Sequence, residues 1–209
     1  MCNIKNLLEE IKNKNFEGIE KLLNLHIHTT CSDGSLTPDE VIEFVRKNGY
    51  KYFSITDHNT FEAYSKIDYK NIEGLITGIE FDCWYRGVFM HLLCYGINPF
   101  AEEMVPFLAK TKAETQKDIV RIFSKRDVKK IIETVHSLGG IAVLAHPCCC
   151  PTFSLNWFYK KLKKIGLDGV EGFYPYKRHR AIIKFHCAKK ALELGKKHDF
   201  LITAGTDKH

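Results

Sequence analysis

The chain has 209 residues, of which 44% are hydrophobic, and its formal net charge at pH 7 is +6. This length supports one sizeable core, so we expect residues 1–209 to form a single domain, with residues 1–20 as an N-terminal helical extension. No uncharged apolar run reaches about 18 residues, which argues against a membrane-spanning helix. The N-terminal segment carries acidic residues and no apolar stretch, unlike a signal peptide, so a cytoplasmic location is the default expectation.

The eight cysteines include no CxxC pair. This spacing favours reduced thiols in a cytosolic protein over disulfides or a thiolate zinc site. Cys148, Cys149 and Cys150 directly follow the candidate ligand His146. One of these thiolates could contact a metal, but adjacent residues cannot all face the same ion. The lysine clusters KRDVKK and KKLKK predict a solvated surface that is compatible with an attraction toward phosphates.

Short apolar runs rich in β-branched or aromatic residues alternate with helical patterns along the chain. Strands are expected over residues 22–28, 50–56, 74–80, 89–96, 140–147, 169–174 and 200–207. Helical patterns occupy residues 38–49, the long segment 99–138, and residues 155–166 and 181–198. The alternation predicts an α/β fold with a parallel sheet, open or closed into a barrel. As an alternative, the third and fourth apolar runs are compatible with a β-hairpin whose turn lies in WYRG.

The first helical pattern has clear boundary signals. Thr37 is placed as the N-cap, Pro38 at the first helical position and Glu40 for a capping box. Gly49 suits the C-terminal stop.

Candidate metal ligands gather at the ends of the expected strands. His26 and His28 lie two residues apart on the first strand, so both side chains point to one face, as two ligands of one metal require. Asp33 follows in CSDGS, where Gly34 permits a tight turn that returns the carboxylate to the site. Taken alone, Asp33 would be interpreted as an ordinary turn or cap residue.

The second and third strands end in TDHN and GIE. Asp57 and His58 point to opposite sides of a regular strand, so we expect one of them, His58, to bind metal. Asp57 is then placed to orient an imidazole. Glu80 ends an apolar strand, which is costly for a carboxylate unless it is paired or metal-bound, and it can bridge two cations.

The later strands carry further candidates. His91 lies among apolar neighbours, where a lone histidine is more often a core residue. His146 ends an apolar strand before Pro147, and Glu171 repeats that pattern, facing either a ligand or the substrate. Asp207 and His209 form a second i, i+2 pair, which in a closed barrel would lie beside the first pair.

The order of these motifs resembles one known family. HIHTTCSDG, TDHN, GIE, MHLLCYG, AHP and GTDKH together resemble the PHP family, named for polymerase and histidinol phosphatase domains. The resemblance runs from about residue 23 to residue 209. It implies a distorted seven-stranded (β/α)7 barrel of the PHP type and hydrolysis of phosphate esters by a metal-bound hydroxide.

The resemblance also implies a di- or trinuclear site. One metal would lie on His26, His28, Glu80 and Asp207. A second would use Glu80, His91 and His146, with Glu80 bridging. The third would use Asp33, His58 and His209. The cofactors expected are two to three divalent ions of zinc, manganese or iron, and Glu80, Asp207 and His58 are the expected catalytic residues.

Charge supports this chemistry independently. Three divalent ions, three carboxylates and neutral imidazoles give the site a net charge of about +3, which favours binding of a phosphate anion. A bound metal also lowers the pKa of its water ligand to roughly 7, which provides a hydroxide nucleophile. Positively charged side chains near the mouth of the barrel are expected to bind the phosphate of the substrate. The candidates are Arg86 in WYRG and the YPYKRHR residues Lys177, Arg178, His179 and Arg180.

The expected partner is a phosphorylated small molecule or a nucleotide, and neither a membrane nor a long nucleic acid is expected. Many nucleotide-acting members of the family carry an Arg-Pro-His-type insertion before the AHP motif, where this chain has KTKAETQKDIVRIFSKRDVKK, and this difference weakens a transfer of nucleotide specificity. Histidinol-phosphate phosphatase is an alternative activity. A non-catalytic metal-binding or regulatory domain is the alternative from another class.

Overall fold

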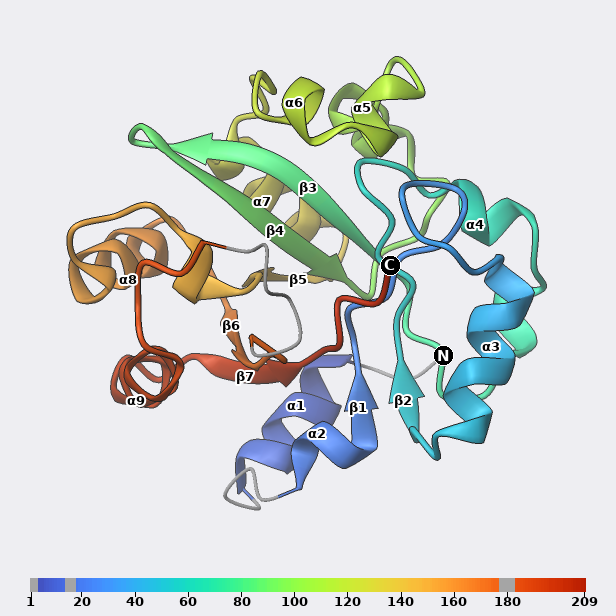
Figure 1. Ribbon diagram of the computed structural model, residues 1–209, viewed down its shortest axis with the longest axis horizontal. Coiled ribbons are helices and arrows are strands. Elements are labelled where there is room, and N and C mark those ends of the chain that lie inside the picture. The colour runs from blue at the N-terminus through green and yellow to red at the C-terminus, as the bar shows by residue number, and fades with distance from the viewer. Residues whose placement is uncertain (1–3, 14–17, 177–182) are drawn as a thin grey trace.

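The computed structural model describes residues 4–13, 18–176 and 183–209 as an α/β fold in which helices flank a mixed sheet (Figure 1). Two short strands, β1 (Leu23–Asn24) and β2 (Tyr52–Phe53), pair in parallel. The remaining strands within the described residues form one sheet, in the order β3 (Gly78–Tyr85), β4 (Val88–Tyr95), β5 (Ile141–Leu144), β6 (Gly169–Phe173) and β7 (Leu201–Ala204).

The larger sheet is mixed rather than parallel. Strand β4 runs antiparallel to both β3 and β5, whereas β5, β6 and β7 are parallel. The hairpin interpretation of the third and fourth runs is therefore confirmed. Its turn consists of Arg86 and Gly87, with φ values of 52° and 77°, and positive φ at both turn residues matches the twist of a two-residue hairpin.

The two sheets meet at isolated contacts. Leu25 N donates to Ala204 O over 2.9 Å, and His28 N donates to Lys208 O over 3.0 Å. On the side of β2 and β3, isolated β-bridges join Phe53 to Leu75 and His58 to Glu80. The described residues thus place β1 and β2 between β7 and β3, but they do not form one continuous seven-stranded ladder.

The first expected helix is confirmed as α3 (Pro38–Lys47). The Thr37 side chain accepts a hydrogen bond from Glu40 N, and the Glu40 side chain accepts one from Thr37 N, which completes the capping box. Gly49 follows the helix with a φ of 72°, the left-handed conformation that ends a helix without a Cβ penalty.

The segment 99–138 is broken, contrary to the helical expectation. It contains η2 (Glu102–Phe107), α5 (Ala113–Gln116), α6 (Asp118–Arg121) and α7 (Val128–Ser137). Pro106 lies inside η2, where its ring prevents a regular α-helix. Asp127 accepts hydrogen bonds from Lys129 N and Lys130 N and so starts α7 as a separate helix.

The remaining helices cover the sheets from several sides. Helices α8 (Leu155–Lys164) and α9 (Ala188–Lys197) lie on the side of β6 and β7 in Figure 1, and α3 lies on the side of β2. Helix α9 begins at Ala188, later than the pattern over 181–198 predicted. The other short elements are α1 (Ile4–Asn13), α2 (Ile19–Leu22), α4 (Glu62–Ser65), η1 (Tyr69–Asn71) and η3 (Pro147–Cys149).

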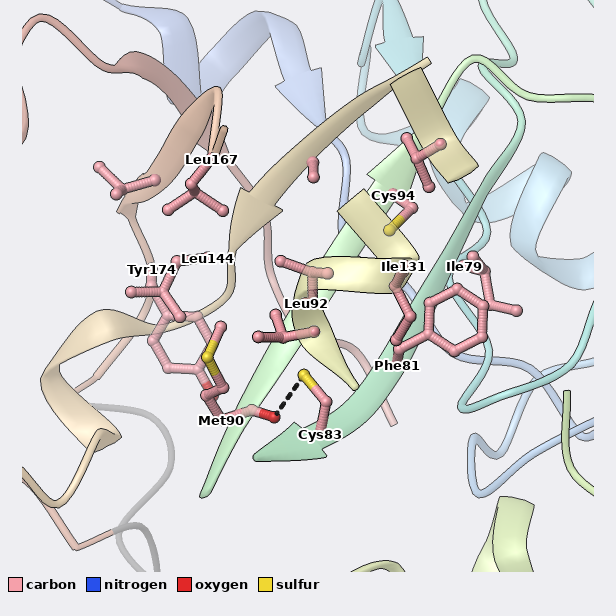
Figure 2. Packing of buried hydrophobic residues seen from close by; sticks show 14 of the residues in the cluster. Ile79, Phe81, Cys83, Met90, Leu92, Cys94, Ile131, Leu144, Leu167 and Tyr174 are labelled. Carbon is pink, nitrogen blue, oxygen red and sulfur yellow. Dashed lines mark hydrogen bonds between the residues drawn. The ribbon is translucent and has the colours of Figure 1, made fainter. Parts of the chain in front are cut away.

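The main hydrophobic cluster extends from α3 to α8 and α9 across the sheet, and Figure 2 shows its part around the β3–β4 hairpin and α7. Phe81, Leu92 and Ile131 are completely buried in it. A second cluster joins α1 to the ends of the strands through Ile4 and Leu8. This packing leaves the opposite strand ends to polar side chains. No helix within the described ranges is long and apolar enough to cross a membrane.

Candidate metal centre

Four ligand atoms converge beside the end of β1. His26 and His28 are 0% and 1% exposed, and their Nε2 atoms lie 3.2 Å apart. Glu80 Oε2 lies 3.2 Å from each of these nitrogens. Asp207 Oδ1 lies 3.2 Å from His26 Nε2 and 3.1 Å from His28 Nε2. The two i, i+2 pairs expected on the first and last strands are therefore adjacent.

These spacings fit a bound cation. In a tetrahedral site with metal–ligand distances of about 2.0–2.1 Å, neighbouring ligand atoms are about 3.3–3.4 Å apart. The five distances among His26, His28, Glu80 and Asp207 given above all lie close to that value. Glu80 Oε2 is also buried without a hydrogen-bond partner among the described residues. A carboxylate oxygen in that state is costly unless a cation compensates it.

Glu80 is the centre of a wider cluster. Its Oε1 atom lies 3.1 Å from His91 Nδ1 and 3.4 Å from His146 Nε2, while Oε2 also lies 3.4 Å from His58 Nε2. His58, Glu80 and His91 form a second group whose ligand atoms could hold a metal ion. His91 is therefore brought to the cluster and is not an isolated core histidine.

Asp33 belongs to a third group. Its Oδ1 atom lies 3.6 Å from His28 Nδ1 and 3.4 Å from His209 Nε2, and its Oδ2 atom lies 3.7 Å from His58 Nε2. The loop returns because residue 34 is glycine: a Cβ there would lie 2.4 Å from the carbonyl carbon of His28. The expected tight turn is thus present over residues 30–33, closed by Gly34 N donating to Thr29 O over 2.9 Å, and it carries the Asp33 carboxylate back over the imidazoles.

Further polar residues hold the candidate ligands in place. Glu171 Oε1 lies 3.1 Å from His26 Nδ1, and Glu171 Oε2 accepts a hydrogen bond from His146 N over 2.8 Å. The Tyr174 hydroxyl donates to Asp207 Oδ2 over 2.6 Å. Glu171 therefore contacts a candidate ligand, which was one of the two interpretations of its position.

Asp57 acts on the loop before Asp33 and not directly on an imidazole, which corrects the expectation. It accepts hydrogen bonds from Thr29 N over 2.7 Å, from Thr29 Oγ1 over 2.6 Å and from Ser32 Oγ over 2.6 Å. Ser32 Oγ in turn lies 3.5 Å from His28 Nδ1. The reason is geometric: the Asp57 carboxylate is directed at the first-strand loop, where one backbone N–H and two hydroxyl groups donate to it.

Two charged residues near the centre were not predicted. Asp82 is completely buried, and its Oδ1 atom lies 3.2 Å from His91 Nε2 and 3.4 Å from His58 Nδ1. Arg121 is 4% exposed and donates to Asp33 Oδ2 over 2.7 Å. The sequence signal for Asp82 is its i, i+2 spacing from Glu80, the same spacing that identified the histidine pair. No local pattern identifies Arg121.

The charges of the centre shift the pKa values of its members. Burial alone lowers the pKa of His28, but the adjacent carboxylates of Asp207 and Glu80 outweigh burial and raise that pKa to about 10. For Glu80, burial acts to raise the pKa, yet the charges of His26, His58 and His91 hold it well below its ordinary value. The carboxylates therefore favour positive charge at this position, and the imidazoles keep Glu80 ionised.

Of the expected substrate-binding residues, Arg86 lies within the described part of the chain, and it is not among the residues that line the cleft over the centre. Arg86 lies at the tip of the β3–β4 hairpin, with its guanidinium 5.8 Å from the Tyr85 ring centroid. Lys177, Arg178, His179 and Arg180 lie outside the described residues. A cleft of about 610 Å³ opens over the candidate ligands. Its wall includes Phe89, Ile122 and Phe185, and Arg121 is the one Lys or Arg among its described lining residues.

Comparison with known proteins gives the class of this fold and site. The chain belongs to the PHP domain family, which matches residues 24–188. This match confirms the resemblance drawn from the motifs and the enzyme class expected from it, a PHP-family phosphoesterase.

Cys149 and Cys150 also line the cleft above the centre.

Relatives in sequence are distant but cover most of the chain. The chain is 23% identical over 216 residues to a 5'-3' exoribonuclease of Haemophilus influenzae, covering 72% of this chain and 78% of that protein. It is 22% identical over 253 residues to a phosphoribosyl 1,2-cyclic phosphate 1,2-diphosphodiesterase of Eggerthella lenta, covering 89% and 93%.

Solved structures support the fold. An amidohydrolase from Chromobacterium violaceum with bound sulfate superposes with a TM-score of 0.71 at 16% identity, over 90% of this chain and 87% of that one. A protein of Bifidobacterium adolescentis assigned as a metal-dependent phosphoesterase superposes with a TM-score of 0.68 at 20% identity, over 90% and 88%. At these identities the likeness establishes the fold alone.

Proposed function

We propose that this chain hydrolyses a phosphate ester at a centre of two to three divalent ions, of zinc, manganese or iron. The observation that carries the proposal is the set of ligand–ligand distances of 3.1–3.2 Å among His26, His28, Glu80 and Asp207. Such spacing matches the edges of a tetrahedral metal site. His and carboxylate donors suit all three metals.

The proposed ligand sets are those that the resemblance implies, and the groups around the centre support them in part: the first coincides with one group, whereas His146 is absent from the second group and His28 joins the third. His26, His28, Glu80 and Asp207 would hold one ion, and Glu80, His91 and His146 a second, with Glu80 shared. Asp33, His58 and His209 would hold the third. The grouping of His58 with Glu80 and His91 makes His58 available to the second position as well, because its Nε2 atom faces both Glu80 and Asp33.

When bound, the ions would activate water at neutral pH and stabilise negative charge on the phosphate. The chain's own residues set the ligand geometry and the net charge. Asp82 and Glu171 add two negative charges beside the three carboxylates counted from sequence, and Arg121 adds one positive charge, so the residual charge falls to about +2. That value still favours an anionic substrate. Glu80, Asp207 and His58 are proposed as the residues on which turnover depends.

The cleft supports a substrate with an apolar or aromatic part. Phe89, Ile122 and Phe185 form a wall beside the ligands, and aromatic rings favour stacked or edge contacts with a planar group. A small phosphomonoester or a nucleotide fits this wall. The exoribonuclease relative favours a nucleotide-type substrate over histidinol phosphate, and the phosphoribosyl cyclic phosphate of the other relative shares the ribose phosphate part of a nucleotide. We propose Arg86, Lys177, Arg178 and His179 as further phosphate contacts.

The finer architecture is part of the proposal. The contacts between β1 and β7 and the bridges from β2 toward β3 support a distorted seven-stranded barrel whose closure is irregular on the β1–β2 side. Residues 1–209 are proposed as a single domain, because Ile4 and Leu8 of α1 pack into a cluster with strand residues.

Metal content, paired with hydrolysis of an aryl phosphate before and after chelation, tests the proposal. Two to three ions per chain, with activity lost on chelation and restored by manganese or zinc, is the expected result. Glu80→Gln and Asp207→Asn should lose turnover while the chain remains folded. A panel of nucleoside monophosphates and histidinol phosphate then separates the two candidate activities. Bound metal without hydrolysis of any ester would instead support a non-catalytic domain.

A further inference from the structure

Strand β3 carries a second buried carboxylate on the side of the candidate metal centre. Asp82 lies two residues after Glu80, so the two side chains share one face of the strand. In the β3–β4 hairpin Asp82 is directly opposite His91. It is 0% exposed, and burial of a carboxylate requires compensating partners.

Two imidazoles lie between Glu80 and Asp82. His91 places Nδ1 3.1 Å from Glu80 Oε1 and Nε2 3.2 Å from Asp82 Oδ1. His58 places Nε2 3.4 Å from Glu80 Oε2 and Nδ1 3.4 Å from Asp82 Oδ1. In each ring, one nitrogen therefore faces Glu80 and the other faces the same oxygen of Asp82.

The second oxygen of Asp82 is already engaged. Asn59 Nδ2 donates to Asp82 Oδ2, and Asp82 N donates to Asn59 Oδ1 over 3.1 Å. Asn59 has a φ of 55°, a left-handed conformation that asparagine tolerates better than most residues. Its amide also donates to Glu114 O over 3.0 Å. Asn59 thus fixes the plane of the Asp82 carboxylate and leaves Oδ1 directed at the two rings.

The Asp82 oxygen that faces the two rings makes no hydrogen bond, and its one further charged neighbour among the described residues is Arg121. Asp82 Oδ1 and His58 Nδ1 are both buried, and neither has a hydrogen-bond partner among the described residues. Their approach of 3.4 Å, like that of His91 Nε2 to Asp82 Oδ1 at 3.2 Å, is a close contact of possible donor and acceptor atoms. Arg121 Nε lies 3.6 Å from Asp82 Oδ1. The guanidinium supplies positive charge beside Asp82, and Asp82 is not a member of the candidate metal-binding groups among the described residues.

We propose that Asp82 is a positioning residue that accepts the N–H of His58 Nδ1 and of His91 Nε2. Each ring is thereby fixed in the tautomer whose lone pair, on His58 Nε2 and His91 Nδ1, is directed at the metal side beside Glu80. A carboxylate behind a ligating imidazole orients the ring and raises its basicity. One carboxylate here would serve two ligands, and this inference rests on the proposed metal centre.

The tautomers can be read directly in the unmodified protein. In the zinc-loaded wild-type chain, imidazole nitrogen NMR should show the proton of His58 on Nδ1 and that of His91 on Nε2. The opposite proton on either ring would overturn the inference. Absence of zinc binding by the wild-type chain would instead contradict the proposed metal centre, so the two failures are distinguishable.

A substitution gives the second test. Asp82→Asn should weaken zinc binding by roughly 10- to 100-fold, measured by competition with a chromogenic chelator. The matched control is Asp168→Asn, which breaks a His–Asp contact of 2.8 Å to His136 outside the centre, and it should leave zinc affinity unchanged. Equal affinity of Asp82→Asn and the wild-type chain, or equal losses in both variants, would overturn the inference.

Discussion

Arg121 Nη1 donates a hydrogen bond to Asp33 Oδ2 over 2.7 Å, between residues 88 positions apart in the chain. The same atom donates to Thr115 O over 3.0 Å, and Nη2 pairs with Asp118. The Arg121 side chain is 4% exposed. One buried guanidinium therefore connects the segment containing α5 and α6 to a candidate metal ligand.

Removal of this guanidinium should destabilise the metal-free protein. In Arg121→Gln, Asp33 and Asp82 lose a nearby positive charge, and breaking a buried ion pair costs about 3–5 kcal/mol. We expect a loss of unfolding free energy at the lower end of this range, because the Asp33 side chain is 17% exposed. Urea denaturation of the chelated protein measures the change. Added zinc should restore part of the loss, since a cation beside Asp33 replaces the missing charge.

Asp118→Asn is the matched control for this prediction. The Asp118 side chain is 87% exposed, and an exposed ion pair contributes about 0–1 kcal/mol. A loss of stability in the control as large as that in Arg121→Gln would mean that the contact of Arg121 with Asp33 has no special importance.

Metal binding should release protons. The pKa of His28 in the metal-free protein is raised to about 10, against the effect of burial, by the adjacent carboxylates of Asp207 and Glu80. His28 is therefore protonated at pH 7–8, and a metal ion must displace that proton. The apparent affinity should rise with pH by up to about tenfold per pH unit for each proton released, until the pH reaches the pKa.

Calorimetry in buffers of different ionisation enthalpy measures the protons released per metal ion. His28→Asn provides the comparison, since it removes the titrating ring while leaving a polar side chain. A binding enthalpy independent of the buffer at pH 7.5 would contradict the raised pKa.

The candidate ligands were predictable because strand ends and period-two spacing determine where side chains meet. His26 and His28 share a face by alternation, and Asp207 reaches them because β7 lies beside β1. These relationships depend on short stretches of sequence and on strand order. The capping box of Thr37 and Glu40 was predictable for the same reason, since its hydrogen bonds join residues three positions apart.

Arg121 could not be predicted, because its position depends on how an irregular segment folds back. The segment 99–138 was expected to be helical, and a long helix would have carried Arg121 away from the centre. Instead α6 ends at Arg121 and directs it at Asp33. Asp57 was misassigned for a related reason: its partners Thr29 and Ser32 lie in the loop after the first strand, whose conformation depends on Gly34.

Gly34 should be required for a complete centre. An alanine Cβ at this position would lie 2.4 Å from the His28 carbonyl carbon and 2.7 Å from Thr29 N, so the loop must shift and Asp33 with it. We expect Gly34→Ala to reduce the number of zinc ions bound per chain, measured by elemental analysis after dialysis. Ser35→Ala, at an exposed neighbouring position, should bind as much zinc as the wild-type chain. Full zinc content in Gly34→Ala would show that the Asp33 position tolerates the shift.

The thiols near the cleft should be poorly reactive despite their location. Burial raises the pKa of Cys148 to about 11 and that of Cys149 to about 12. Backbone N–H groups of Lys190 and Lys189, by contrast, lower the pKa of the exposed Cys187 at the start of α9. Since the thiolate is the nucleophile, iodoacetamide at pH 8 should modify Cys187 well before Cys148 or Cys149.

Peptide mapping of the alkylated chain at successive times measures this order. Cys149→Ser should retain bound metal, because a protonated thiol is a poor metal ligand and the His and carboxylate groups around Glu80 already provide the donors. Loss of metal in Cys149→Ser, or early alkylation of Cys149 that chelation accelerates, would instead place its sulfur on an ion. In that case the cleft wall beside His146 would be part of the metal centre.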